Sequence, residues 1–225
     1  IYAQKSITSD VLKELSESYQ NNGTEKAIRN AVNGTSIKQL TLNRDVKNAT
    51  DTWFSNKVNS SGVTDQLQSG RCWLFTGTNV IRARVMAETG MKNFHFSQVY
   101  TFFYDQLEKS NLFLQGIIDT RKKPMDDKMV EWLFRNPLSD GGQFTGVSDL
   151  IEKYGLVPQE VMPETYCSNN TNEFSALLKR KLREYAIGLR EASDNGASEK
   201  ALEKQKVEMM KTVYRMLVYA YGNPT

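Results

Sequence analysis

Apolar residues recur every three or four positions along most of this chain, which is the spacing of one face of an α-helix. Two segments near the start, TSDVLKELSESYQ and TEKAIRNAVNG, follow this pattern. In the first, Ser9 is the expected N-cap because its hydroxyl can accept a backbone N–H of the first turn. The second is expected to stop at Asn33 and Gly34. Residues 43–62 break the pattern and are predicted to be polar and irregular.

The helical pattern returns at residue 72 and continues to the end of the sequence. Helices are expected over 72–87, from Ser97 onward, over DDKMVEWLFRN with Asp126 and Asp127 in its first turn, from Thr145 to a stop at Gly155, and over roughly 172–192 and 198–221. The last two are predicted to form an antiparallel hairpin. The prolines of LVPQEVMPETY favour extended backbone, and no alternating strand pattern of any length occurs.

The composition is that of a globular protein long enough to bury a core, with 39% hydrophobic and 24% charged residues among 225. Its 29 basic and 26 acidic residues are interleaved, so no charged block indicates a nucleic-acid partner. No apolar run approaches the roughly 18 residues that span a bilayer, so no membrane contact is expected. Two cysteines and one histidine are too few for a disulfide framework or, without carboxylates, for a zinc site. We therefore expect no metal and no cofactor.

Cys72 lies in the stretch DQLQSGRCWLF, immediately before an apolar run. If a helix begins there, its unpaired amide groups and its dipole favour a thiolate, the nucleophilic form of the side chain. The backbone N–H of Cys72 and the side-chain amide of Gln66 could then donate to the oxyanion of an acyl-transfer reaction. The alternative is that Cys72 only caps a buried helix and that Gln66 is a surface residue.

Four motifs follow one another along the chain. They are Q-x(3)-G-R-C-W-L-F, FHFSQVYTFFYDQLEKSNLFL, WLFRNPLSDGGQF and KYGLVPQEVMPETY. Together they resemble the active-site segment, second helix, substrate loop and following stretch of papain-like cysteine peptidases. The Arg before the Cys and the Trp-Leu-Phe after it resemble the bleomycin hydrolase and aminopeptidase C branch. The likeness covers roughly residues 50 to 170 and continues more weakly through the helical hairpin.

The resemblance implies an α+β papain-like fold, of which this mostly α chain is the helical part and the β-domain is missing. Its three expected parts follow from that fold. Residues 1–62 would form a helical and irregular segment that packs on the domain. Residues 63–170 would be the domain with the catalytic cysteine and the substrate loop, and residues 171–225 a helical hairpin insertion.

The resemblance also implies roles for single residues. Cys72 would be the nucleophile and Gln66 the oxyanion-hole residue. The implied substrate-binding residues lie in one loop: Gly141, Gly142, Gln143 and Phe144. The two glycines would pair with an extended peptide, and their neighbours are candidates for the wall of a side-chain pocket. Without the resemblance, the double glycine would be interpreted as a tight turn that binds nothing.

The sequence departs from the family's pattern in residues 65–71, the segment that leads to Cys72 and is called the cysteine loop below. Asp65 stands where the family often has Asn, and Leu67, Gln68 and Ser69 stand where it often has Lys-Ser-Ser. These substitutions change the surface of the loop more than they change the groups proposed for catalysis. They put the substrate preference in doubt rather than the type of reaction.

A thiol peptidase needs a histidine as base and usually an Asn that orients it. In the resembled family both come from the β-domain, far downstream. The one histidine here, His95, lies 23 residues after Cys72, where the family does not place its base. Cys167 is predicted to be a packed or surface thiol. The chain is therefore expected to be the nucleophile-bearing half of an enzyme and to be inactive alone. Three explanations stay open: a truncated form of the protein, the ordered part of a longer chain, or one chain of a split enzyme.

The resemblance implies three partners: a peptide substrate, the remaining C-terminal half, and further copies of the chain in a hexamer. The alternative is a peptide-binding module of the same fold without catalysis. Exopeptidase or endopeptidase action stays open, because the arm that directs the branch toward aminopeptidase action is not in this chain. The branch is mostly cytoplasmic, whereas the opening residues 1–4 leave an exported form open.

Overall fold

The structure is a computed structural model that describes residues 6–58, 60 and 62–224. The chain divides into two compact units, residues 1–57 and residues 58–225, and each is described by itself. Residues 1–4, which left an exported form open, lie outside the described residues. Within the described ranges, no helix is both long enough and apolar enough to cross a membrane.

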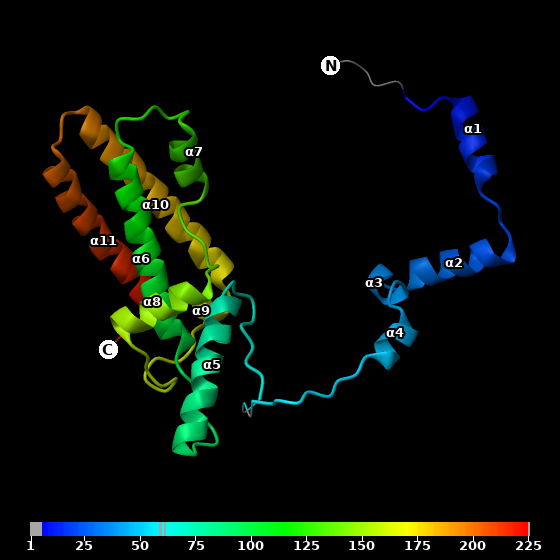
Figure 1. The fold of residues 1–225 in the computed structure, drawn as a ribbon. Coiled ribbons are helices and arrows are strands. Elements are labelled where there is room, and N and C mark those ends of the chain that lie inside the picture. Colours follow the sequence, from blue (N-terminus) through cyan, green and yellow to red (C-terminus); the bar gives the residue numbers. More distant parts are fainter. Residues whose placement is uncertain (1–5, 59, 61, 225) are drawn as a thin grey trace. The chain divides into compact units, whose positions relative to one another are not determined.

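The first unit is a series of short helices (Figure 1): α1 (Ser9–Ser18), α2 (Gly23–Gly34), α3 (Ile37–Leu40) and α4 (Arg44–Ala49). The two helices predicted from apolar periodicity are confirmed. The cap of α1 differs by one residue from the prediction, because the hydroxyl of Thr8, not that of Ser9, accepts the N–H of Val11. A polar side chain still begins the helix, as the sequence requires.

The prediction that residues 43–62 are irregular throughout is wrong for α4. The side-chain oxygen of Asn43 accepts the backbone N–H groups of Asp45 and Val46 at 3.0 and 3.1 Å. This cap satisfies the donors that a helix start leaves unpaired. A local polar contact thus begins a helix that hydrophobic periodicity does not reveal.

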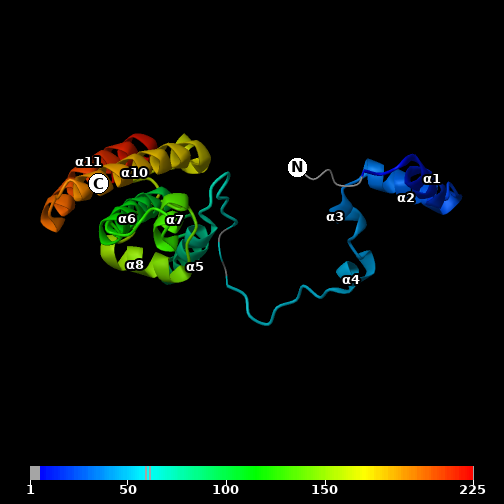
Figure 2. The same ribbon diagram turned by 90° about the horizontal axis from the view of Figure 1, so that it is seen from above.

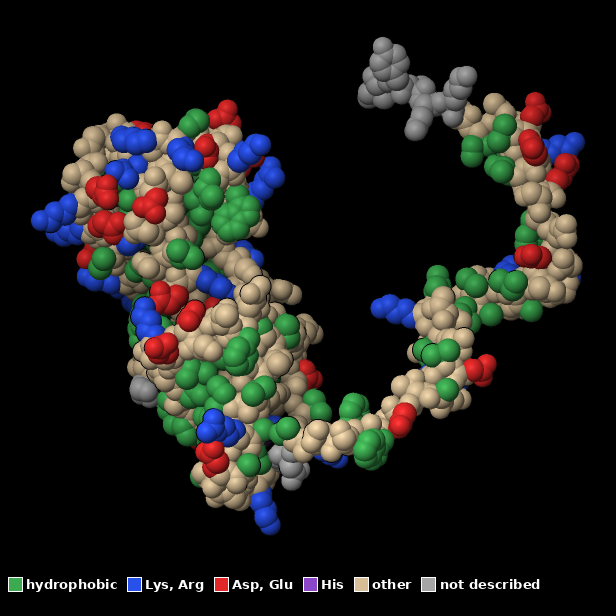
Figure 3. All heavy atoms as spheres, in the orientation of Figure 1, with side chains coloured by type: hydrophobic (Ala, Val, Ile, Leu, Met, Phe, Trp, Pro, Cys, Tyr) green, Lys and Arg blue, Asp and Glu red, His purple; other side chains and the backbone are tan. Residues whose placement is uncertain are grey.

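The apolar faces of α1 and α2 are exposed. No residue of either helix is buried, and Leu12, Leu15 and Ile28 are each more than half exposed. The space-filling view shows apolar side chains along both helices (Figure 3). Amphipathic faces of this kind normally pack against another surface. The expected packing of the N-terminal segment on the domain stays a prediction.

The second unit contains the longer helices: α5 (Cys72–Thr89), α6 (Gln98–Asp119), α7 (Lys128–Arg135), α8 (Phe144–Tyr154), α9 (Tyr166–Asn169), α10 (Thr171–Asp194) and α11 (Glu199–Tyr221). Helix α6 is at the centre. The pair α10 and α11 packs on one side of it, and α5 and α8 lie on the other (Figure 2). The predicted antiparallel hairpin is confirmed.

Helix α6 is buried along most of its length because other helices surround it. Ser97 begins it, as predicted, with a hydroxyl that accepts the N–H of Tyr100 at 3.1 Å. Its fully buried side chains contribute to one core: Val99, Phe102, Phe103, Leu114, Ile117 and Ile118. A helix that is apolar on several sides is expected at the centre of a bundle.

Two predicted helix starts are shifted. Asp127 is the N-cap of α7, and its carboxylate accepts the N–H groups of Met129 and Val130, so neither Asp126 nor Asp127 lies inside the first turn. Helix α8 begins one residue before Thr145. It ends as predicted, because Gly155 adopts φ 75° and stops it.

Two isolated bridges are the only β-structure in the described part of the chain. Gln68 pairs in parallel with Asn170, and Phe96 pairs in antiparallel with Pro158. The second bridge includes Pro158 of the LVPQEVMPETY stretch, which was predicted to be extended from its prolines. That prediction is wrong for residues 159–161, which form a turn in which the N–H of Val161 donates to the carbonyl oxygen of Pro158 at 3.1 Å. The first bridge joins the cysteine loop to a segment about a hundred residues away, and it helps to fix the candidate site.

Candidate active site

Cys72 is the first residue of α5, and it is exposed to solvent. The preceding residue, Arg71, is the N-cap, and its carbonyl oxygen accepts the N–H groups of Leu74 and Phe75 at 2.9 and 3.0 Å. The positive end of the helix dipole therefore lies at the residue that carries the thiol, as the sequence predicts. Helix α5 thus presents a solvent-accessible sulfur at its N-terminus.

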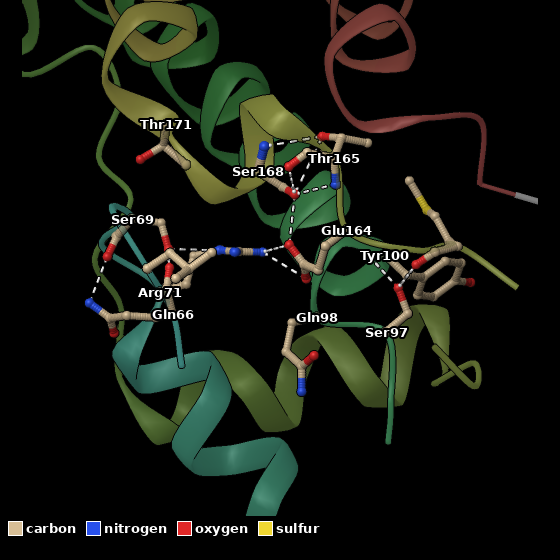
Figure 4. Close-up of polar contacts among 12 residues, drawn as sticks. Gln66, Ser69, Arg71, Ser97, Gln98, Tyr100, Glu164, Thr165, Ser168 and Thr171 are labelled. Carbon is tan, nitrogen blue, oxygen red and sulfur yellow. Dashed lines mark hydrogen bonds and ion pairs between the residues drawn. The ribbon is translucent and has the colours of Figure 1, made fainter. Parts of the chain in front are cut away.

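Gln66 folds back over the turn that leads to Cys72. Its Nε2 donates to the carbonyl oxygen of Ser69 at 2.6 Å, and the Ser69 hydroxyl donates to the carbonyl oxygen of Gln66 at 2.7 Å (Figure 4). Leu67 between them has φ 52°, in the left-handed region, which turns the chain sharply. The Gln66 amide carries a second N–H beyond the one given to Ser69. The side chain is therefore held on the turn and keeps a donor.

The cysteine loop is held upstream by backbone hydrogen bonds. The N–H of Gln68 donates to the carbonyl oxygen of Asn169 at 3.0 Å, and the N–H of Thr171 donates to the carbonyl oxygen of Gln68 at 3.2 Å. Both partners lie at the junction of α9 and α10. Gln68, one of the departures from the family pattern, acts here through its backbone, so the side-chain change does not affect these contacts.

Downstream, the loop is held by Arg71. This side chain has no exposed surface, and its Nη1 donates to both carboxylate oxygens of Glu164 at 3.0 and 2.8 Å. The sequence analysis did not identify Glu164, because no local pattern marks an acid between Pro163 and Thr165 as a partner of the cysteine loop. The one available indication was Arg71 itself, because an arginine that becomes buried normally pairs with an acidic side chain.

The loop with the two glycines lies on the residue after Cys72. The indole N–H of Trp73 donates to the carbonyl oxygen of Asp140 at 2.8 Å. A Cβ at Gly142 would lie 2.6 Å from ring atoms of Trp73, so only glycine fits. Gly141 is exposed at the surface. The structure therefore brings the predicted substrate loop against the start of the helix that carries the thiol.

Two further predicted residues complete the loop. Gln143 is the exposed residue before α8, and Phe144 opens α8 with 57% of its surface exposed. An aromatic ring this accessible has a free apolar face. Both therefore lie at the surface beside Gly142, where an apolar side chain of a bound peptide could contact them.

Lys109 of α6 fixes the same loop, and the sequence analysis did not identify it. Its Nζ donates to the carbonyl oxygens of Ser139 and Gly141 at 3.0 and 2.7 Å and forms an ion pair with Asp105 at 2.8 Å. Burial raises the pKa of the Asp105 carboxyl above its ordinary value, although the neighbouring Lys109 opposes the shift. A lysine directed at backbone oxygens holds the loop in one conformation. The position of Lys109 within a predicted helix did not indicate that its side chain contacts the loop.

Asp140 joins the loop to α10. Its carboxylate accepts hydrogen bonds from the hydroxyls of Thr171 and Ser175. A Cβ at Gly70 would lie 2.8 Å from the Cβ of Asp140, so the cysteine loop and the substrate loop touch there. The sequence analysis did not identify Asp140, and the only sequence feature that could have indicated its role is its position directly before the double glycine.

The other two groups considered from the sequence lie elsewhere. His95 Nδ1 accepts a hydrogen bond from Arg82 Nη1 at 2.7 Å, and partial burial and the Arg82 charge lower its pKa. Arg82 is ten residues after Cys72 on α5, about 15 Å along the helix axis. Cys167 is half-buried in α9 and packs against the core, as predicted. Among the described residues, no cluster of three or more His, Cys, Asp or Glu could hold a metal ion.

Comparisons with known proteins give a consistent picture. The profile of the peptidase C1-like family matches residues 6–225. Aminopeptidase C of Lactobacillus delbrueckii subsp. lactis is 36% identical over 220 residues, which make up 98% of this chain and 49% of the relative. Bleomycin hydrolase of Homo sapiens is 37% identical over 175 residues, which make up 76% of this chain and 38% of the relative.

A solved structure shares the fold. The crystal structure of PepW from Lactobacillus rhamnosis HN001 matches with a TM-score of 0.89 and 40% identity, and the match covers 98% of this chain and 50% of PepW. The chain therefore spans about half the length of the curated aminopeptidases and of the solved structure that it matches.

Proposed function

The chain belongs to the peptidase C1-like family, and we propose that it is the nucleophile-bearing half of a papain-like cysteine peptidase that acts through Cys72. The predicted fold class, a mostly helical part of the papain-like fold, is confirmed by the match to PepW. One observation carries the proposal: an exposed cysteine begins α5 on the same turn as Gln66, with the double-glycine loop packed on the next residue, Trp73.

In the proposed reaction the Cys72 thiolate attacks the carbonyl carbon of a peptide bond. The carbonyl oxygen becomes an oxyanion, which accepts hydrogen bonds from the backbone N–H of Cys72 and from the second N–H of Gln66. The C–N bond then breaks, the amine leaves with a proton from a general acid, and a thioester remains. Water attacks the thioester and gives a proton to the same group acting as base. The C–S bond then breaks, which releases the acid product and returns the Cys72 thiolate.

The proposed acid and base is a histidine on the remaining half of the protein, oriented there by an Asn. His95 is a poor candidate, because its Nδ1 accepts a hydrogen bond from Arg82, which lies ten residues after Cys72 along α5. We propose that the chain needs the C-terminal half to turn over substrate. The exposed apolar faces of α1 and α2 fit contact with a further part of the protein.

The proposed substrate is a peptide that lies extended along Gly141 and Gly142, with a side chain near Gln143 and Phe144. Removal of N-terminal residues is the preferred form of the reaction, because relatives over nearly the whole chain are named aminopeptidases. A homo-oligomer, a hexamer by resemblance, belongs to the same proposal. The second candidate is a peptide-binding module without catalysis, which the engagement of the single histidine with Arg82 favours.

The test uses the complete protein, with the C-terminal half present. Cys72→Ala is compared with Cys167→Ala, which removes the other thiol. We expect Cys72→Ala to abolish hydrolysis of aminoacyl and peptide substrates and to take up no papain-selective epoxide, as measured by intact mass. Cys167→Ala should keep both properties. Hydrolysis that persists in Cys72→Ala contradicts the proposal, and peptide binding without any turnover in the wild type favours the binding module.

A further inference from the structure

We propose that the buried ion pair between Arg71 and Glu164 positions the Cys72 thiol for attack, so that Arg71 and Glu164 are positioning residues of the reaction. This inference rests on the proposed peptidase function. Neither residue touches the substrate in this role. They act by fixing the backbone that carries the nucleophile and one of its oxyanion donors.

Two of the three nitrogens of the buried Arg71 guanidinium have hydrogen-bond partners, and the third, Nη2, is buried without one among the described residues. Nη1 faces both carboxylate oxygens of Glu164, and Nε donates to the Ser69 hydroxyl at 2.9 Å (Figure 4). Its Cζ lies 5.1 Å from the centre of the Phe75 ring and 5.5 Å from that of Phe102. Contacts in its plane and to aromatic rings together leave the group one orientation.

The carboxylate of Glu164 is fixed as well. Its Oε2 accepts a hydrogen bond from the Ser168 hydroxyl at 2.6 Å. Ser168 is fully buried and forms a capping box with Thr165 at the start of α9, and Thr165 in turn donates to the carbonyl oxygen of Ala220 in α11. The pair therefore ties the residue before Cys72 to the scaffold of α9 and α11.

The contacts of Arg71 lead directly to the reacting groups. Ser69, which receives the Nε hydrogen bond, also accepts the Gln66 side chain at its carbonyl oxygen. Arg71 is also the N-cap of α5 through its backbone carbonyl oxygen, so a side chain that holds this residue in place also holds the start of the helix at Cys72. One guanidinium thus fixes the relative positions of the proposed nucleophile and the proposed oxyanion donor, and small displacements of such groups slow a reaction strongly.

A buried ion pair is weak evidence for stability, because apolar residues of similar volume often stabilise a fold equally well. A purely structural role and a positioning role therefore make different predictions for a double variant. Arg71→Met with Glu164→Leu removes both charges together, so that no unpaired charge stays buried. If the pair only stabilises the fold, this variant folds and reacts normally. If it positions the thiol, the variant folds but reacts slowly.

The experiment measures melting temperature, kcat, KM and the rate constant of epoxide alkylation in the complete protein. The variants are the double variant and Arg71→Lys, which keeps the charge but loses the planar fork. Arg190→Met is the control, because Arg190 is a half-buried arginine that joins separate segments by donating to the backbone oxygens of Thr120 and Lys123, far along the sequence from the cysteine loop. Arg71→Lys also decides the question if the double variant does not fold.

We expect the double variant to melt close to the wild type, with kcat and the alkylation rate constant each lower by about tenfold to hundredfold and KM little changed. Arg71→Lys should show a smaller loss of kcat, and Arg190→Met none. Wild-type kcat in the folded double variant, or in Arg71→Lys if that alone folds, overturns the positioning role. A wild-type protein that neither hydrolyses peptides nor takes up the epoxide overturns the proposed function, and this inference with it.

Discussion

The indole N–H of Trp73 donates to the carbonyl oxygen of Asp140 at 2.8 Å, so the residue after the candidate nucleophile is bonded to the residue before the double glycine. Gly142 lies against the face of the same indole. One side chain therefore sets the position of the loop relative to the start of α5. The distance between the double glycine and Cys72 therefore depends on how Trp73 packs against the loop.

Gly142→Ala tests this dependence. The added methyl would lie 2.6 Å from Cδ2 and Cε2 of Trp73, a distance that real side chains do not adopt. The loop must move away, and the hydrogen bond from Trp73 to Asp140 must lengthen. We expect kcat/KM for peptide hydrolysis by the complete protein to fall by roughly tenfold to hundredfold. The measurement is steady-state kinetics with a fluorogenic aminoacyl substrate.

Gly146→Ala is the matched control, because Gly146 faces the same ring. A Cβ there would lie 3.6 Å from Cζ3 of Trp73, which is ordinary van der Waals contact. Gly146 is also inside α8, where alanine is favoured over glycine by about 1 kcal/mol. We expect unchanged kinetics and an equal or higher melting temperature. Equal activity in the two variants would show that the loop position does not matter.

Lys109→Met tests how the substrate loop is held. The variant loses the hydrogen bonds from Nζ to the oxygens of Ser139 and Gly141, and it leaves the buried Asp105 carboxylate without its cation. We expect a lower melting temperature, because an uncompensated buried charge destabilises the fold. KM should rise by about threefold to tenfold, since each lost hydrogen bond contributes about 1 kcal/mol.

A second substitution separates these two effects. Adding Asp105→Asn to Lys109→Met removes the unpaired charge but does not restore the bonds to the loop. The melting temperature should recover toward that of the wild type while KM stays high. Recovery of KM together with stability would mean that Lys109 affects binding only through the stability of the domain.

Gln66→Ala tests the proposed oxyanion donor. Loss of one such donor typically lowers kcat by about a hundredfold to a thousandfold with a smaller effect on KM. Gln68→Ala is the control, because Gln68 holds the loop through its backbone N–H and carbonyl oxygen, which the substitution keeps. We expect Gln68→Ala to retain kcat. A Gln66→Ala enzyme that is as fast as Gln68→Ala would exclude Gln66 from the oxyanion hole.

The sequence predicted those parts of the fold that local spacing determines. The long helices α5, α6, α10 and α11 follow from apolar periodicity, and Ser97 and Gly155 mark ends that local capping fixes. Helix α4 was missed because its start depends on the polar cap of Asn43 rather than on an apolar face. Helix α4 has only 6 residues, which is too short a segment to show an apolar period.

The candidate site was predicted only as far as it lies in contiguous motifs. Cys72, Gln66 and the double glycine were found because each motif is short. The contacts that hold them join residues far apart in the sequence, such as Arg71 with Glu164, 93 residues away. Such pairs form because the helices bring them together, and no local pattern encodes that choice. A single sequence therefore indicated the candidate reacting groups but not the residues that hold them in place.

His95→Gln tests whether the single histidine takes part in the reaction. Burial and then Arg82 lower the pKa of His95 below its ordinary value of 6.5. On acidification the unfolded chain therefore binds this proton before the folded chain does, so wild-type stability falls as the pH drops through and below 6.5. We expect His95→Gln to reduce this pH dependence of the melting temperature, measured between about pH 5 and pH 8, and to leave hydrolysis unchanged. Loss of hydrolysis in a folded variant would instead identify His95 as the base, and an unchanged pH dependence would mean that its proton is not coupled to folding.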